Sequence, residues 1–187
     1  MSTKLSPGMI APDFDTQDVF GNRISLQSYA ASGKRLHLNF FRNAACAMCN
    51  LQVHRLIQQY PTYQQSGVEI IAVFESPEAN ILQYVTRQNV PFPIIADPGA
   101  KLYDLYGVET SQEKVMAQVD MDWRNGLIQE AEAIGYPLTK EEGSNFFRLP
   151  AEFLIGQDQK IYEAYYAEVV GVHLPHEAVD SFMAQLV

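Results

Sequence analysis

Two cysteines separated by two residues are the side chains of this sequence whose type and spacing could do redox chemistry. Cys46 and Cys49 form a Cys-Ala-Met-Cys motif and are the only cysteines among the 187 residues. Thiols this close can form and break a disulfide reversibly, and the thiolate is the nucleophile in that exchange. A purely structural disulfide across so short a loop would remove little unfolded-state entropy. The motif therefore predicts reactive thiols.

The sequence around the motif predicts that it begins a helix. Upstream, residues 36–41 are mostly apolar and are typical of a buried strand. Downstream, apolar side chains recur at steps of three and four from Cys49 to Tyr60, the period of a helix packed on one face. Free amides and the helix dipole stabilise a thiolate in the first turn. Because Cys49 lies on the apolar stripe, we expect it to point inward, and we expect Cys46 to be open to solvent and to be the nucleophile.

Arg42 lies at the end of the expected strand, just before the motif. Its charge and its hydrogen bonds could lower the pKa of the Cys46 thiol. An arginine at a strand end is as often a solvated surface residue, so both interpretations stay open.

The expected reaction cycle begins with the Cys46 thiolate. It attacks a hydroperoxide to give a sulfenic acid, or a substrate disulfide to give a mixed disulfide. Cys49 then closes the internal bridge. A partner reductant must reopen that bridge before the next turnover.

Zinc binding is the main alternative use of the two thiols. Cys46 and Cys49 could join His54 and either His173 or His176 as ligands. Structural zinc sites generally use two ligand pairs, whereas this chain has one cysteine pair. We therefore expect no metal site, and we expect no other cofactor.

Composition narrows the remaining function classes. The chain has 187 residues, of which 47% are hydrophobic, and this favours one enlarged domain over residues 1–187. Its formal net charge is -9. No basic run is present to bind a phosphate backbone, so nucleic acid is not an expected partner. No signal segment and no run of about eighteen apolar residues appears, which predicts a cytoplasmic protein with no membrane partner.

The pattern of apolar residues predicts an α/β fold. We expect a short hairpin within residues 8–26, and strands at 36–41, 69–75, 91–95, 152–155 and 161–166. Helices are expected from the cysteine motif with a break near Pro61, from Ser76-Pro77-Glu78 with Ser76 in the capping position, at 102–106 and at 175–186. The segment 36–75 is then a strand, helix, strand unit.

Residues 108–147 interrupt this alternation. They are mostly polar, with amphipathic spacing at Val115, Val119, Trp123 and Ile128 that is typical of one or two inserted helices. We expect this insertion to border the active site. The alternative is a layer that only covers a sheet edge.

Three separated motifs together resemble a known family. They are Ala11-Pro-Asp-Phe14 with Gly21 and Leu26, the run from Phe40 to Cys49, and Leu149-Pro150-Ala-Glu-Phe-Leu-Ile155 followed by Lys160-Ile161. Their order resembles the peroxiredoxin-like family (alkyl hydroperoxide reductase and thiol-specific antioxidant proteins) of the thioredoxin fold.

The resemblance implies a fold, a site and partners. The fold would be a thioredoxin-like three-layer sandwich with a central mixed sheet, an N-terminal hairpin and a helical insertion before the last hairpin. Pro150 would be the cis-proline that faces the cysteines. The partners would be a hydroperoxide or disulfide substrate and a thioredoxin- or glutathione-type reductant, and the family also allows a homodimer.

The sequence departs from the usual peroxiredoxin pattern, Pro-x-x-x-Thr/Ser-x-x-Cys. If Cys49 takes the peroxidatic place, Cys46 and Arg42 replace the hydroxyl residue and the proline; with Cys46 in that place, Asn43 and Asn39 do. The family arginine before the late strand is also displaced, and Arg148 is the nearest candidate.

Two classes of function therefore stay open. One is an antioxidant oxidoreductase that reduces hydroperoxides, or disulfides alone, through a Cys46/Cys49 cycle. The other is a non-catalytic thioredoxin-fold module in which the thiols sense redox state or only pack.

Overall fold

A computed structural model describes residues 3–185 of the chain. Its strands are β1 (Asp15–Gln17), β2 (Arg23–Ser25), β3 (Arg35–Phe41), β4 (Val68–Phe74), β5 (Ile94–Ala96), β6 (Ala151–Ile155) and β7 (Ile161–Tyr166). Its helices are α1 (Leu26–Ala31), α2 (Ala47–Gln65), α3 (Glu78–Tyr84), the 3-10 helix η1 (Thr86–Gln88), α4 (Lys101–Leu105), α5 (Gln112–Met116), α6 (Asp122–Ala133) and α7 (His176–Met183).

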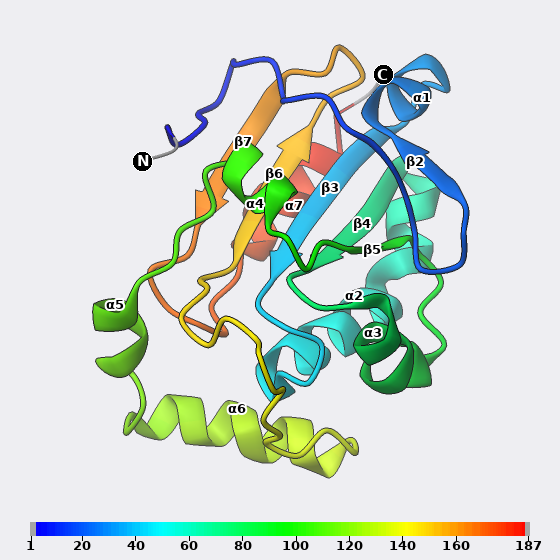
Figure 1. Ribbon diagram of the computed structural model, residues 1–187. Coiled ribbons are helices and arrows are strands. Elements are labelled where there is room, and N and C mark those ends of the chain that lie inside the picture. The colour runs from blue at the N-terminus through cyan, green and yellow to red at the C-terminus, as the bar shows by residue number, and fades with distance from the viewer. Residues whose placement is uncertain (1–2, 186–187) are drawn as a thin grey trace.

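A mixed sheet forms the centre of the molecule (Figure 1). Its strand order is β5-β4-β3-β6-β7, with β3 parallel to β4 and antiparallel to β6. Strands β6 and β7 form the expected closing hairpin, and β1 and β2 form a separate antiparallel hairpin. The parallel β3 and β4 end side by side, so the loops that follow them meet at one edge of the sheet.

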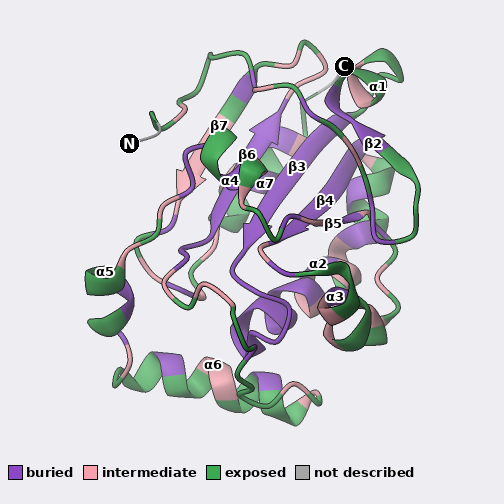
Figure 2. Ribbon diagram, viewed as in Figure 1, coloured by how far each residue is buried: buried purple, intermediate pink, exposed green. Residues whose placement is uncertain are grey.

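Helices cover both faces of this sheet. Side chains of α2, α3 and α7 pack with one face in a single apolar cluster, whereas α1 and α4 pack with the other. All seven residues of β3 and all seven of β4 are buried, as the purple central strands of Figure 2 show. The predicted thioredoxin-like three-layer α/β sandwich is confirmed.

Helix α2 corrects one expectation about the chain. It continues through Pro61 to Gln65 as one helix, where a kink or a restart was expected, so the restart is wrong, and Ser66 and Gly67 end the helix as expected. Proline in a helix interior removes one backbone hydrogen bond. Tyr60 and Tyr63, on either side of Pro61, are buried in the main core, and this packing holds the helix together across the missing bond.

Residues 108–147 contain the two expected inserted helices, α5 and α6. In Figure 1 they lie at the bottom of the view, beyond the end of the sheet. Helix α6 packs on the start of α2 through a small cluster of Ala47, Leu51 and Ala131. The insertion thus packs against the start of α2, next to the two cysteines.

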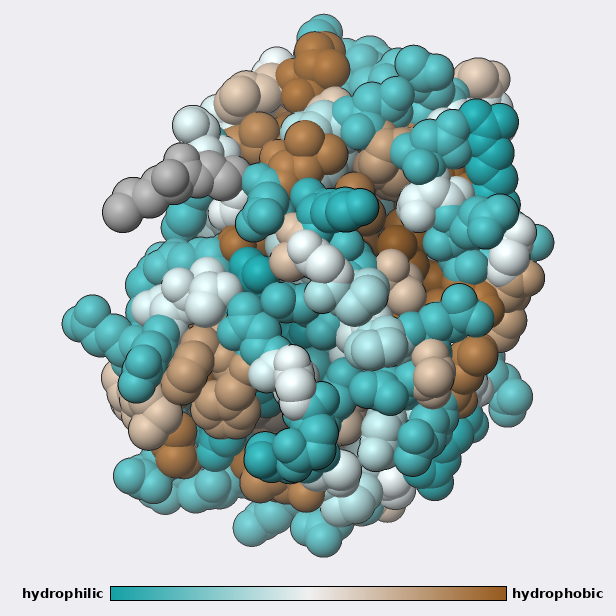
Figure 3. All heavy atoms as spheres, in the orientation of Figure 1, coloured by the Kyte–Doolittle hydropathy of each residue, from teal (hydrophilic) through white to brown (hydrophobic). Residues whose placement is uncertain are grey.

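Surface hydropathy is mixed on the face that Figure 3 shows, where hydrophobic areas alternate with hydrophilic ones.

The 19-residue helix α2 has many polar residues. Within residues 3–185, none of the helices combines the length and the apolar character needed to cross a bilayer.

Candidate active site

Cys46 is the residue that caps the start of α2. Its backbone is extended (φ -65°, ψ 117°), and its Sγ accepts a hydrogen bond from the Cys49 amide at 3.3 Å. The Cys46 carbonyl accepts the Asn50 amide at 3.0 Å, the first bond of the helix. The sulfur therefore stands at the positive end of the helix dipole, where negative charge is stabilised.

Arg42 contacts the same sulfur. Its Nη2 donates to Cys46 Sγ at 3.3 Å, and its Nη1 donates to the Phe146 carbonyl at 3.2 Å. The guanidinium also lies 4.8 Å from the centre of the Phe146 ring. Arg42 is only 4% exposed. The structure thus places it against the thiol and not in solvent.

The two thiols have opposite acidities. Burial by itself would raise the pKa of Cys46, but the hydrogen bond from the Cys49 thiol, the charge of Arg42 and the Cys49 amide outweigh it and lower that pKa to about 5. For Cys49, burial, the hydrogen bond to Cys46 and the negative charge on Cys46 all raise the pKa. The pair is a thiolate beside a protonated thiol, which is the arrangement that a nucleophile and a resolving thiol require.

The exposure of Cys46 corrects the sequence-based expectation. Cys46 is 2% exposed and Cys49 is 5% exposed, so both thiols are buried. Arg42 and the Phe146 backbone contact each other next to the sulfur, and they close the side that was expected to be open. A substrate reaches Cys46 only if these covering groups move.

Side chains from distant segments hold the loop before α2. The Ala44 amide donates to Ser76 Oγ at 2.9 Å, and the Ala45 amide donates to Glu141 Oε2 at 3.1 Å. Ser76 therefore does not cap α3, where Pro77 is the capping residue and makes no side-chain bond. Glu141 belongs to the insertion, which confirms that the insertion borders the cysteine site.

A cavity of about 450 Å³ opens beside Arg42. Its lining includes Arg42, Asn43, Arg124, Leu138, Glu141 and Phe146. The cysteines themselves are not among the lining residues, because the Arg42 side chain separates them from the cavity.

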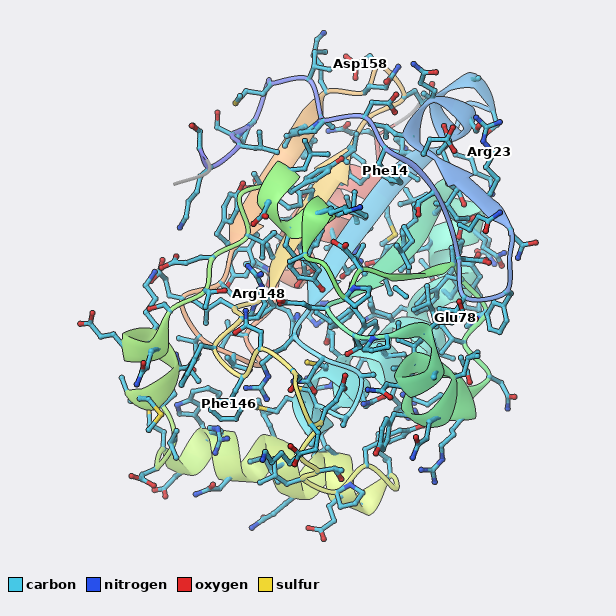
Figure 4. The ribbon with its side chains drawn as sticks, in the orientation of Figure 1. Phe14, Arg23, Glu78, Phe146, Arg148 and Asp158 are labelled. Atoms are coloured by element: carbon cyan, nitrogen blue, oxygen red, sulfur yellow. The ribbon has the colours of Figure 1, made fainter. Side chains whose placement is uncertain are left out.

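Arg148 is bound to groups other than the thiols. Arg148 Nε donates to Glu75 at 2.6 Å, its Nη1 donates to the Val108 carbonyl, and its guanidinium lies over the ring of Tyr103. Figure 4 shows Arg148 close to the start of β6, whereas Phe146 lies nearer to α6.

The peptide bond before Pro150 is trans, as are all the described peptide bonds, so the expected cis-proline is wrong. The Pro150 carbonyl accepts the Ala167 amide at 3.0 Å and continues the pairing of β6 with the chain after β7. Pro150 is thus an ordinary proline that enters a strand, and trans is the favoured isomer.

A second buried polar group was not found from the sequence. Glu152 accepts hydrogen bonds from His37 Nε2 at 2.8 Å, His173 Nδ1 at 2.7 Å and the Leu174 amide at 3.1 Å, and Tyr63 Oη lies 2.9 Å from His37 Nδ1. Burial would raise the pKa of Glu152, but the hydrogen bonds from the two histidines outweigh it and lower that pKa. The available signal was one glutamate and one histidine inside otherwise apolar strands, since buried polar side chains need partners.

The histidines of the alternative zinc site lie in other surroundings. His54 contacts Gln58 at 3.0 Å, and His173 is held by Glu152. Within residues 3–185, no group of three or more Cys, His, Asp or Glu side chains is arranged to hold a metal ion.

The acidity of Cys46 predicts an unusual pH profile for its alkylation. The rate with neutral iodoacetamide follows the thiolate fraction, so it should be nearly constant between about pH 6 and pH 8 and fall below the Cys46 pKa of about 5. An ordinary thiol would gain about 70-fold over that interval. Labelling followed by peptide mapping measures the profile; a midpoint near the ordinary value would contradict the site geometry.

Replacement of Arg42 tests the cause of that acidity. Arg42→Met removes the charge and the hydrogen bond at Sγ, so the midpoint should rise by about one to three pH units. Arg55→Met is the matched control, because Arg55 pairs with Glu130 on the surface away from the thiols. An unchanged midpoint in Arg42→Met would show that Arg42 does not tune the thiolate.

The chain is similar in sequence to a known family and to named relatives. A model of the AhpC/TSA family matches residues 7–164. The thiol-disulfide oxidoreductase ResA of Geobacillus thermodenitrificans is 35% identical over 107 residues, which are 57% of this chain and 60% of that protein. ResA of Halalkalibacterium halodurans is 34% identical over 102 residues, 54% of this chain and 56% of that protein. The chain thus spans about 60% of the length of the first of these curated relatives.

Solved structures share the fold at low sequence identity. Peroxidoxin BcpB from Mycobacterium tuberculosis superposes with a TM-score of 0.67 at 13% identity, covering 96% of this chain and 95% of that chain. A putative thiol:disulfide interchange protein DsbE from Chlorobium tepidum gives a TM-score of 0.65 at 16% identity, covering 97% of this chain and 100% of that one.

Proposed function

We propose, because the chain belongs to the AhpC/TSA family, that Cys46 and Cys49 carry out thiol-disulfide oxidoreduction. The observation that carries this proposal is the asymmetry of the pair. Cys46 has a pKa lowered to about 5 and Cys49 has a raised one, while Arg42 and the helix start hold the charge. Relatives named thiol-disulfide oxidoreductase support the same chemistry.

The proposed steps balance in sulfur bonds and protons. The Cys46 thiolate attacks one sulfur of a substrate disulfide, the substrate S–S bond breaks, and one substrate thiolate leaves. That leaving thiolate takes up the proton of Cys49. The Cys49 thiolate then attacks Cys46, the mixed disulfide breaks, and the second substrate thiolate leaves. An external reductant, either one dithiol of the thioredoxin type or two molecules of glutathione, reduces the Cys46–Cys49 bond again and is itself oxidised to a disulfide.

Reduction of hydroperoxides is a second candidate, supported by the contact between Arg42 and Cys46. A guanidinium that donates to the attacking sulfur is also placed to stabilise charge on a peroxide oxygen as the O–O bond breaks. In this route the Cys46 thiolate attacks one peroxide oxygen, the O–O bond breaks, and the alkoxide or hydroxide leaves and takes a proton from water. Cys46 is then a sulfenic acid, and the Cys49 thiol displaces water from it to form the same disulfide. Arg148 is bound to Glu75, and this route assigns it no step.

We also propose that the protein works in a reducing compartment such as the cytoplasm. The lowered pKa of Cys46 stabilises the reduced, dithiol form, which such a compartment maintains. In that state the chain donates electrons to substrate disulfides or peroxides.

Parallel assays with the wild-type chain test these candidates. With dithiothreitol as the reductant, insulin precipitation should be faster than with dithiothreitol alone. With thioredoxin, its reductase and NADPH, hydrogen peroxide consumption measures the second candidate. Acceleration of insulin reduction alone identifies a disulfide reductase, and acceleration of peroxide consumption identifies a peroxidase. A chain that accelerates neither reaction would overturn the enzymatic proposal and favour a non-catalytic redox module.

A further inference from the structure

We propose that the cavity beside Arg42 binds the carboxylate of a small, partly apolar disulfide or hydroperoxide substrate, and that Arg124 is its principal anion contact. This inference rests on the proposed function and adds the substrate class. Arg124 comes from α6 in the insertion, whereas Arg42 follows β3, so the cavity joins the inserted segment to the thioredoxin-like core.

Arg124 is a buried cation without a carboxylate partner. It is 9% exposed, and its Nη1 donates to the Val119 carbonyl at 3.0 Å. Among residues 3–185 it forms no ion pair within 4.0 Å. Burial and then the positive charge of Arg42 lower the pKa of Arg124, against the opposing charges of Cys46 and Asp120. Two guanidinium groups, those of Arg42 and Arg124, therefore line one cavity.

Among residues 3–185, the carboxylates in the lining form no ion pair with Arg42 or Arg124. Glu141 accepts the Ala45 amide at 3.1 Å and Asn80 Nδ2 at 2.9 Å. Glu142 pairs with Lys140 at 3.0 Å, and both of those side chains are strongly exposed. An anion that entered the cavity would pair directly with Arg124, because a guanidinium binds a carboxylate through two parallel hydrogen bonds.

Arg42 has unused hydrogen-bonding capacity. Its buried Nε has no partner, although Nη1 and Nη2 bind the Phe146 carbonyl and Cys46 Sγ. A buried donor without a partner is costly, and because Nε is covered, a ligand oxygen reaches it only after the Arg42 side chain turns. The Arg42 side chain also contacts Cys46 Sγ. A ligand that binds Arg42 is therefore separated from the nucleophilic sulfur only by the guanidinium group.

Apolar side chains complete the cavity. Leu138 is 59% exposed and Phe146 is 41% exposed, and both line it. Figure 3 shows hydrophobic residues gathered between α5 and the loop before β6, the region in which Figure 4 labels Phe146. A volume of about 450 Å³ accommodates a small organic molecule. The lining suits an aromatic or acyl body that carries one carboxylate.

Two disulfide probes test the carboxylate preference. We expect the reduced wild-type chain to react with 5,5′-dithiobis(2-nitrobenzoate), which carries carboxylates, faster than with neutral 2,2′-dithiodipyridine, after each rate is divided by the rate of free cysteine. The normalised rate with the carboxylate probe, divided by that with the neutral probe, should be about ten in the wild type. This ratio should fall to about one in Arg124→Gln, because the charge pair between Arg124 and the probe carboxylate is lost. Arg55→Gln removes the same charge from the surface of α2 and should keep the ratio.

The outcomes separate this inference from the proposed function. If neither probe oxidises the thiols of the wild-type chain, the proposed function fails. If both probes do so with a normalised ratio near one, or if Arg55→Gln lowers the ratio as much as Arg124→Gln does, only the carboxylate site fails.

Two further measurements on the unmodified protein complete the test. 4-Nitrobenzoate should slow the reaction of Cys46 with 2,2′-dithiodipyridine in a saturable way, whereas 4-nitrobenzamide should not; equal effects would overturn the site. Linoleic acid hydroperoxide compared with its methyl ester shows whether the carboxylate substrate is a peroxide as well. Faster consumption of the acid than of the methyl ester would assign the site to both disulfide and hydroperoxide substrates. Equal consumption of the acid and the ester would restrict the site to disulfide substrates.

Discussion

Cys46→Ser should abolish turnover of disulfides, with a loss of at least about a thousandfold, because the attacking sulfur is gone. The substitution is structurally mild, since Cys46 caps α2 through its side chain and serine is a preferred capping residue. Circular dichroism and thermal melting should therefore match the wild type. Initial rates of 2,2′-dithiodipyridine reduction and of insulin reduction measure the loss.

Cys49→Ser is the matched variant and should behave differently. Its Cys46 still attacks, but no second thiol closes the bridge, so a mixed disulfide between Cys46 and the substrate should accumulate. Mass spectrometry under non-reducing conditions detects that adduct. The opposite pattern, with an inactive Cys49→Ser and a trapped adduct on Cys49 in Cys46→Ser, would reassign the nucleophile.

Glu152→Leu should lower the free energy of unfolding by about 3–5 kcal/mol, as expected when one partner of a buried charged network is removed. The substitution leaves His37, His173 and the Leu174 amide without their shared acceptor. Urea denaturation at pH 7 measures the change. Glu163→Leu is the control, because Glu163 lies in the adjacent strand β7 and its side chain forms no ion pair or hydrogen bond with another side chain within residues 3–185. It should change stability by no more than about 0.5 kcal/mol.

The same network sets the direction of acid sensitivity. The pKa of Glu152 is lower in the folded chain than in the unfolded chain. Its carboxylate therefore contributes stability that is present above the unfolded pKa of about 4.3 and is lost as the pH falls below it. The stability difference between wild type and Glu152→Leu should shrink on acidification. A difference that grows towards low pH would contradict this account of the network.

Local patterns were sufficient to predict the architecture and the thiol pair. The apolar run of β4 and the periodic stripe of α2 depend on neighbours in sequence, and both form where periodicity places them. The Cys-x-x-Cys spacing at a strand-to-helix junction likewise needs only local geometry. The family resemblance predicted the order of the elements correctly but wrongly predicted a cis bond before Pro150. That bond is trans, which is the isomer that local chemistry favours.

The covering of the thiols could not be predicted in this way. Cys46 is buried because Arg42 reaches Phe146, 104 residues away, and because the Ala45 amide bonds Glu141, 96 residues away. Nothing in the sequence near Glu141 indicates such a partner, since one glutamate in a polar segment is ordinarily solvated. Arg148 shows the same effect, because its contact with Glu75 brings together the ends of two distant segments.

Stoichiometric oxidation by 2,2′-dithiodipyridine tests most directly whether Cys46 and Cys49 form a working dithiol. The reduced wild-type chain should release two equivalents of pyridine-2-thione per chain without added thiol, and peptide mapping should then find a Cys46–Cys49 disulfide. Release of a single equivalent, with a stable pyridyl adduct left on Cys46, would show that the second sulfur cannot close the bridge and would contradict the proposed cycle.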